Sequence, residues 1–288
     1  MRLHAFARLA RPRQWIKNTF VLPGLIFGHA LESPDKVTAA LVATLAFCLM
    51  SSAVYAMNDV CDCDRDREHP DKRTRPIASG EIGVREAIVF AILLAVAALA
   101  LGLRASPAVA GILAGYAVLN LAYSLGLKRI PVVDVFIIAA GFMLRILAGT
   151  LGIGIAPSRW LLLCGFLVTL FLGFAKRRAE LIRLADDAGQ HRPVLDAYNE
   201  SFLDAAILVC AAGTLGAYAV YTVAPDTIAQ HGTDLTLTVP FVMFGTFRYL
   251  FLLRHRGGGG DPSNELLDDR WLLGSAAGWA ATVVLLIG

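Results

Sequence analysis

The strongest constraint in this sequence is a series of long apolar runs separated by short charged segments. Of the 288 residues, 57% are hydrophobic and 17% are charged, whereas a typical soluble domain carries about 25% charged residues. These runs are long enough, or nearly so, to span a bilayer core of about 30 Å as helices. They predict an all-α membrane protein with residues 1–288 in a single domain. We expect nine spans, near 16–31, 37–57, 83–103, 107–126, 132–152, 158–175, 202–223, 236–253 and 271–287.

Lys and Arg are distributed very unequally between the two sides of this arrangement. With the N-terminus inside, 21 of the 26 Lys and Arg residues fall in inner loops, three fall in outer loops, and Arg145 and Arg248 lie within apolar runs. This asymmetry predicts a cytoplasmic N-terminus and an outer C-terminus. The long charged loops 58–82 and 176–199 are then both cytoplasmic, so we expect the functional site on that face. The net charge of +3 does not indicate nucleic-acid binding.

The first polar motif is an acidic segment directly after the second run. Asn58, Asp62 and Asp66 recur at every fourth residue, and Asp59 precedes Asp62 by about one turn. If the helix continues, these oxygens project from one face and suit Mg²⁺, which prefers a few carboxylates together with phosphate oxygens and water. A basic stretch, His69 to Arg75, follows, as expected if a metal-bound polyphosphate lies between them. The alternative is a solvated loop whose charges merely pair with one another.

A second motif joins the fourth and fifth runs. It contains Tyr123 and Lys128, followed by Asp134 and Arg145, which are about three turns apart on one face of a helix. A charge at the depth of Arg145 costs at least about 2.5 kcal/mol, so Arg145 should face a polar cavity. The alternative is a structural ion pair within the helix bundle.

Two further clusters are less specific. Lys176, Arg177 and Glu180 extend the sixth run beyond the inner interface, where they form either a second polar cluster facing the acidic segment or an ordinary surface helix. The segment from Arg11 to Asn18, which contains Lys17, is either a membrane anchor built around an interfacial Trp or a source of phosphate ligands.

These residues form a recognisable pattern. Asn58-Asp59-x-x-Asp62-x-x-x-Asp66, with His-Pro-x-Lys-x-x-Arg-Pro-Ile from His69 to Ile77, resembles the UbiA superfamily of intramembrane prenyltransferases. The resemblance implies a nine-helix bundle of the UbiA type with Asp-rich loops on the cytoplasmic face of a bacterial-type inner membrane.

Within the superfamily, the chain most resembles members that use a phosphoribosyl donor. The matching pieces are Arg11-Pro-x-Gln-Trp-x-Lys-Asn18, Tyr123-Ser-x-x-Leu-Lys128, Gly141-Phe-x-x-Arg145-x-x-Ala-Gly149 and Lys176-Arg-x-x-Glu180. Other members carry a second Asp-x-x-x-Asp motif where this chain has Lys176 to Glu180. Cations at that position favour a second phosphate-bearing substrate over a second metal-diphosphate clamp.

The resemblance implies a Mg²⁺-dependent transfer of 5-phosphoribosyl from 5-phosphoribosyl 1-diphosphate to a polyprenyl phosphate in the membrane. It assigns metal binding to Asn58, Asp62 and Asp66, and catalysis to Asp59, Asp62 and Asp66. Candidate substrate-binding residues are Lys17, Asn18, Arg67, Lys72, Arg75, Tyr123, Lys128, Asp134, Arg145, Lys176, Arg177 and Glu180. The alternatives are prenyl transfer to an aromatic or haem acceptor, and a transporter that uses Asp134 and Arg145. Homo-oligomerisation is left open.

Overall fold

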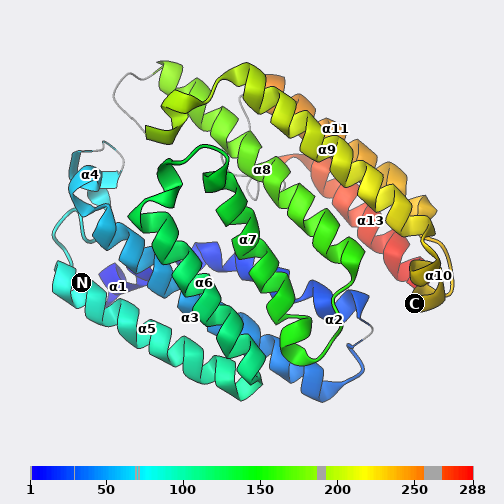
Figure 1. Cartoon of the computed structure of the whole chain (residues 1–288), viewed down its shortest axis with the longest axis horizontal. Helices are drawn as coiled ribbons and strands as arrows, with labels where there is room; N and C mark the ends of the chain where they lie inside the picture. The colour runs from blue at the N-terminus through cyan, green and yellow to red at the C-terminus, as the bar shows by residue number, and fades with distance from the viewer. Residues whose placement is uncertain are drawn as a thin grey trace. The chain divides into compact units, whose positions relative to one another are not determined.

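Every regular element in the described part of the chain is a helix (Figure 1). The computed structural model describes residues 2–28, 30–68, 70, 72–186, 193–255 and 268–287, without the side chains of 183–186 and 193. The chain divides into two compact units, Met1–Ser158 and Arg159–Gly288. The expectation of a single domain over 1–288 stays a prediction.

The first unit contains the Asp-rich motif. Its elements are α1 (Arg2–Ala10), η1 (Pro12–Val21), α2 (Pro23–Phe27), α3 (Pro34–Cys61), α4 (Cys63–Glu68), η2 (Lys72–Thr74), α5 (Val84–Ala105), α6 (Pro107–Leu125), η3 (Leu127–Arg129), α7 (Val133–Ala148) and η4 (Leu151–Ile153), where η denotes a 3₁₀ helix.

The second unit is also helical throughout its described residues. Its elements are α8 (Arg159–Asp186), η5 (Pro193–Ala197), α9 (Glu200–Val223), α10 (Pro225–His231), η6 (Thr236–Thr238), α11 (Val239–His255) and α13 (Arg270–Ile287).

Eight stretches in the described ranges are long and apolar enough to cross a membrane, and they correspond to eight of the nine predicted runs. The remaining run, 16–31, does not form one long helix. It is divided between η1 and α2, because Pro23 at the start of α2 has no N–H to donate and cannot continue the hydrogen bonding of η1.

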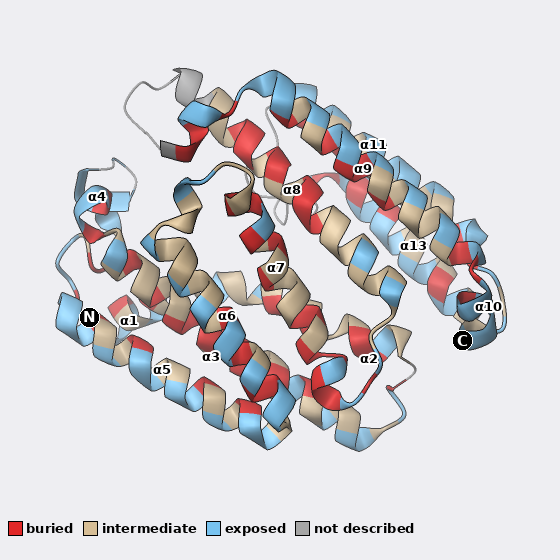
Figure 2. Ribbon diagram, viewed as in Figure 1, coloured by how far each residue is buried: buried red, intermediate tan, exposed pale blue. Residues whose placement is uncertain are grey.

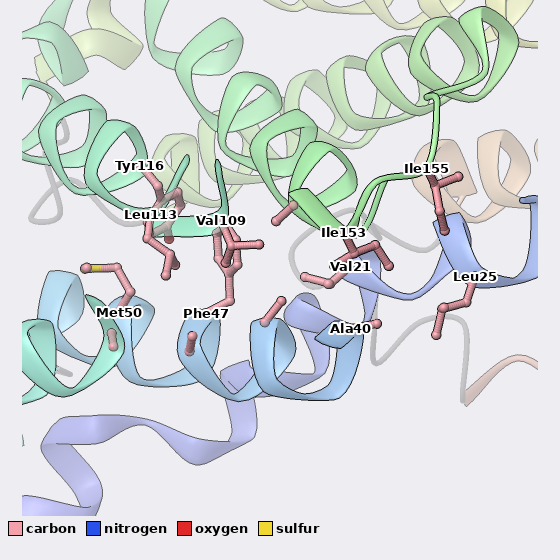
Figure 3. Packing of buried hydrophobic residues seen from close by; sticks show 14 of the residues in the cluster. Val21, Leu25, Ala40, Phe47, Met50, Val109, Leu113, Tyr116, Ile153 and Ile155 are labelled. Atoms are coloured by element: carbon pink, nitrogen blue, oxygen red, sulfur yellow. The ribbon is translucent and has the colours of Figure 1, made fainter. Parts of the chain in front are cut away.

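Helix α3 forms the centre of the first unit. Its buried residues Ala40, Ala43 and Ala46 are small, which lets neighbouring segments approach closely. Phe47 and Met50 extend the same core, which Figure 3 shows close by. The residues that pack around them from other elements include Val21, Leu25, Val109, Leu113, Tyr116, Ile153 and Ile155.

The outer face of α5 is apolar and exposed. Figure 2 shows both exposed and buried residues along α5. Val89, Ile92, Leu93 and Val96 are each more than half exposed, while Ala87, Ala91 and Ala98 are buried. A helix that faces water carries polar side chains on its exposed face. The exposed face of α5 instead carries large apolar side chains, so it is suited to contact lipid.

The backbones of η1 and of the end of α7 touch directly. A Cβ atom at Gly149 would overlap the carbonyl group of Val21, and one at Gly24 would overlap the carbonyl group of Gly149. Gly149 has φ −84° and ψ 0°, a conformation open to other residues. Glycine is therefore required here by the close approach of the chain rather than by the backbone angles.

In the second unit, an ion pair links α11 to the start of α13. Arg248 Nη2 lies 2.7 Å from Asp269 Oδ2, and the backbone N–H groups of Trp271 and Leu272 donate to Asp269 Oδ1. The hydrogen bond from Arg248 lowers the pKa of Asp269 to about 2. Asp269 therefore remains charged at neutral pH, where it caps α13.

Candidate active site

The Asp-rich motif occupies the junction of α3 and α4. Helix α3 ends at Cys61 and α4 begins at Cys63, yet the N–H of Asp62 donates to the carbonyl of Asn58 at 3.0 Å and that of Asp66 to Asp62 at 2.9 Å. The first bond closes α3 and the second opens α4, so the single continuous helix expected from the spacing is interrupted at Asp62. The two bonds still link Asn58, Asp62 and Asp66 in steps of four residues.

Asp59 and Asp66 share one arginine. Arg75 Nη1 donates to Asp59 Oδ1 at 3.0 Å and to Asp66 Oδ2 at 2.6 Å. Asp59 also accepts a hydrogen bond from Arg11, whose guanidinium lies over the ring of Tyr55. Both carboxylates are buried, so these pairs compensate charges that would be costly to bury alone.

Asp62 has a different cation as its partner. Lys128 Nζ, on η3, lies 2.6 Å from one carboxylate oxygen of Asp62 and 2.8 Å from the other. Nearby, Ser124 Oγ near the end of α6 donates to Asn58 Oδ1 at 3.1 Å. The second predicted motif is therefore brought directly against the first, a long-range contact that no local pattern in the sequence specifies.

The oxygen ligands of this motif are chemically suited to a hard divalent cation. Asn58, Asp62 and Asp66 offer one amide and two carboxylate groups, which is a donor set that Mg²⁺ accepts when phosphate oxygens and water complete its shell. In the described ranges, no three His, Cys, Asp or Glu side chains converge as a metal-binding group.

Four other predicted residues of this unit differ in exposure. Arg67 pairs with Asp64 at 2.9 Å, and the Asp64 side chain is 95% exposed. Lys72 is exposed on η2, whereas Lys17 on η1 and Tyr123 near the end of α6 are partly buried. The substrate role of these four residues stays a prediction.

Asn18 and Arg145 form a separate buried network. Arg145 Nε donates to Asn18 Oδ1 at 2.8 Å, Nη1 to the carbonyl of Gly141 at 2.9 Å and Nη2 to Tyr116 at 3.1 Å. The guanidinium also lies within 5.5 Å of the ring centroids of Phe47, Tyr116 and Phe142. All of these partner groups are uncharged. Arg145, on α7, is therefore joined to η1 and α6 through hydrogen bonds and cation–π contacts.

Asp134 is fully buried in the first turn of α7. Among the described residues, the hydrogen-bond partners of Arg145 are neutral groups, so the alternative of a structural ion pair does not describe how this arginine is held. The substrate role of Asp134, Asn18 and Arg145 stays a prediction.

The third predicted cluster lies in the second unit, on α8. Arg177 Nη1 contacts Glu180 Oε2 at 2.6 Å, and the Arg177 side chain is almost completely buried. The next residue, Arg178, donates to Asp204 of α9 at 2.6 Å and to the carbonyl of Leu253 of α11. Lys176 is partly buried, and the side chain of Arg183 lies outside the described residues. Whether this cluster faces the Asp-rich motif stays a prediction.

Two residues of the site were missed by the sequence reasoning. Arg11 belongs to a motif for which only Lys17 and Asn18 were considered as ligands, and Ser124 lies within another motif without an assigned role. Arg11 has φ 51° and ψ 58°, a left-handed conformation that is unusual for an arginine and that commonly marks functional sites. The arginine-proline pair is the only local signal of an unusual turn here.

The fold and the site together define a helical membrane protein with an acidic motif paired to basic residues. The model of the UbiA prenyltransferase family matches residues 20–262. The chain therefore belongs to the UbiA prenyltransferase family and is a multi-pass membrane protein, as its resemblance and its apolar helices predicted.

Curated relatives extend over nearly the whole chain. The chain is 32% identical to the decaprenyl-phosphate phosphoribosyltransferase of Corynebacterium glutamicum, over 96% of this chain and 85% of that protein. It is 34% identical to the enzyme of the same name from Mycolicibacterium smegmatis, over 96% of this chain and 90% of that protein.

Solved structures support the fold. A UbiA homologue from Archaeoglobus fulgidus, bound to GPP and Mg²⁺, superposes with a TM-score of 0.72 at 22% identity, covering 98% of this chain and 99% of that one. At this identity the likeness establishes the fold of this chain and not its substrate.

Proposed function

We propose that this protein transfers the 5-phosphoribosyl group of 5-phosphoribosyl 1-diphosphate to a polyprenyl phosphate of the decaprenyl type and releases pyrophosphate. The product is a lipid-linked phosphoribose for the synthesis of cell-wall or envelope glycans. Two lines of support converge: the names of relatives at 32% and 34% identity over nearly the full chain, and a paired acid–base cluster in the first unit.

The observation that carries the proposal is the juxtaposition of the Asp-rich motif with Arg75 and Lys128. Carboxylate and amide oxygens suit a divalent cation, which we propose is Mg²⁺, and adjacent cations suit phosphate oxygens. A diphosphate can bind the divalent cation and the cationic side chains at the same time. We assign metal binding to Asn58, Asp62 and Asp66, and contacts with the diphosphate to Arg75 and Lys128.

The chemistry requires stabilisation of charge on the leaving group. The bond between the anomeric carbon and the diphosphate breaks, and a phosphate oxygen of the lipid forms the new bond to that carbon. A bound divalent cation supplies charge stabilisation for the departing pyrophosphate. Arg75 and Lys128 add positively charged donors in a partly buried site, where they act more strongly than in water. The lipid phosphate is already ionised at neutral pH, so no strong general base is needed.

The alternative within the family is transfer of a prenyl group from a prenyl diphosphate. The same metal site would serve it, and the solved homologue with GPP and Mg²⁺ is an example of such a ligand on this fold. The basic cluster on α8 favours phosphoribosyl transfer, because Lys176 and Arg177 replace the acids expected for a second metal site.

The decisive test supplies purified protein in nanodiscs with Mg²⁺, 5-phosphoribosyl 1-diphosphate and decaprenyl phosphate. We expect release of pyrophosphate together with a lipid-linked phosphoribose detected by mass spectrometry, and loss of both on addition of EDTA. Prenyl transfer from a prenyl diphosphate, without any phosphoribosylated lipid, would reject the proposed donor and retain the metal site.

We also propose that the chain crosses the membrane nine times, with η1 and α2 making the first crossing. Arg11 contacts Asp59 near the C-terminal end of α3, whereas α3 begins at Pro34, 25 residues or about 38 Å away along its axis. Residues 12–33 must therefore run back along most of α3. A 3₁₀ helix rises about 2 Å per residue, so η1 alone covers about 20 Å.

Opposite locations of the two termini test this topology. Epitope tags placed at the N-terminus and the C-terminus should differ in accessibility, with the C-terminal tag detected on intact spheroplasts and the N-terminal tag only after permeabilisation. The Lys and Arg asymmetry supports this orientation. Detection of both tags without permeabilisation would mean that residues 12–33 do not cross.

A further inference from the structure

The acidic motif and its basic partners form a charge-balanced cluster. Among the described residues, three carboxylates, those of Asp59, Asp62 and Asp66, contact three close cations, those of Arg11, Arg75 and Lys128. A fourth cation, Arg65, reaches Asp62 only at 4.0 Å and its side chain is 57% exposed. The formal charges of the close partners therefore cancel.

The balance matters because the cluster is partly shielded from water. The Lys128 side chain is 11% exposed and that of Asp62 20%. In such surroundings charges interact more strongly than in bulk solvent. A divalent cation alone would add positive charge beside three cations, and a diphosphate alone would add negative charge beside three carboxylates. Only their joint arrival brings charges that largely offset one another.

The geometry also places a cation on each proposed metal-binding carboxylate. Lys128 engages both oxygens of Asp62, and Arg75 engages one oxygen of Asp66. A metal ion that binds these oxygens must compete with Lys128 and Arg75. Once released from the carboxylates, both cations lie beside the metal, where the phosphate oxygens of its diphosphate ligand would be held.

We infer that Lys128 and Arg75 are exchangeable counter-ions, which pass from Asp62 and Asp66 to the diphosphate when metal and diphosphate bind together. This inference rests on the proposed function, since it assumes that the site takes a metal and a diphosphate. It makes the binding of the two ligands mutually dependent, with each bound weakly alone. A site of this kind resists occupation by metal until the diphosphate substrate is present.

Asp59 has a separate part in this arrangement as a positioning residue. Its Oδ1 accepts from both Arg11 and Arg75, so it retains Arg11 as a partner when Arg75 turns towards a phosphate. Trp15 and Ser52 secure the turn that carries Arg11: Trp15 Nε1 donates to Ser52 Oγ at 3.0 Å, and Ser52 donates to the carbonyl of Ala10 at 2.7 Å. Asp59 thus holds Arg75 within reach of both the Asp66 carboxylate and the proposed phosphate position.

The inference is tested by titrating the whole chain in nanodiscs with Mn²⁺. The electron paramagnetic resonance signal of free Mn²⁺ measures how much of the metal ion is bound. Wild type should bind Mn²⁺ weakly, and Lys128→Met should bind Mn²⁺ alone about tenfold more tightly or better, because the competing cation is gone. Arg129→Met is the matched control. Arg129 is the exposed neighbour of Lys128 on η3, and its removal should leave Mn²⁺ affinity unchanged.

Pyrophosphate completes the experiment. Inorganic pyrophosphate should raise the Mn²⁺ affinity of wild type by about tenfold or more, and this enhancement should shrink in Lys128→Met. Mn²⁺ also forms complexes with pyrophosphate in solution, which lowers the signal of free Mn²⁺ without any protein site. The variant Asp62→Asn, which lacks a proposed metal ligand, measures this background. Lys128→Arg keeps the charge and should bind Mn²⁺ as weakly as wild type, which separates loss of charge from altered packing.

The outcomes separate this inference from the function on which it rests. If wild type binds Mn²⁺ alone as tightly as Lys128→Met does, the exchange is rejected while the metal site is retained. If no variant retains Mn²⁺ above the Asp62→Asn background, with or without pyrophosphate, both the exchange and the proposed metal site are rejected.

Discussion

Replacement of Asp66 by asparagine should lower turnover by roughly 100- to 1,000-fold, the range typical when one group that stabilises developing charge, such as an oxyanion-hole donor, is removed. The amide is nearly the same size as the carboxylate but carries no charge, so it is a poorer metal ligand. Arg75 keeps Asp59 as a partner in this variant, so the protein should still fold. Asp62→Asn should have a comparable effect, because Asp62 is the other proposed carboxylate ligand.

Asp64→Asn is the matched control for these variants. Asp64 lies between the two proposed ligands in sequence, yet its side chain is 95% exposed and pairs with Arg67 at the surface. Surface ion pairs contribute little to stability, so turnover and melting temperature should both stay close to those of wild type. The measurement is initial-rate pyrophosphate release at saturating Mg²⁺. Normal rates for Asp66→Asn would remove this residue from the metal site.

The largest effect on stability is expected for Gly149→Ala. The added methyl group would overlap the backbone carbonyl of Val21, which belongs to η1 and cannot rotate away like a side chain. Overpacking of a close-packed interior typically costs about 1–3 kcal/mol, and a clash with backbone should reach the upper end of that range or exceed it. Because η1 carries Asn18 and follows Arg11, its displacement should also reduce activity.

Gly111→Ala provides the comparison. Gly111 lies in α6, and a Cβ atom there meets no other atom within 4 Å. Alanine is favoured over glycine in a helix by about 1 kcal/mol, so this variant should be unchanged or slightly more stable. Thermal unfolding of both variants in the same detergent measures the difference. Equal melting temperatures would show that η1 and α7 can separate without cost.

The helical membrane architecture was largely predictable from the sequence because hydrophobicity is a local property. A run of about twenty apolar residues has few stable alternatives in a bilayer, where every backbone polar group needs a partner within its own segment. Eight of the nine predicted runs appear as long apolar helices. The first run is different, because it is divided at Pro23 into a 3₁₀ segment and a short α-helix, a break that hydropathy does not register.

The acidic residues of the candidate site stand out in the sequence through their four-residue spacing. The structure interrupts the helix at Asp62, between α3 and α4, and the spacing does not register that break. Motif resemblance indicated the family, and the match over residues 20–262 confirms it.

The sequence by itself determined the class of protein, most of its apolar helices and the acidic motif, because each depends on residues close together in the chain. Only the tertiary structure decided which cation meets which acid. Lys128 reaches Asp62 across 66 residues, and Arg11 reaches Asp59 across 48. It also showed that Arg145 lies among neutral partners rather than in an ion pair. Coulomb attraction depends on distance in space, and packing of η1, α3, α6 and α7 sets those distances.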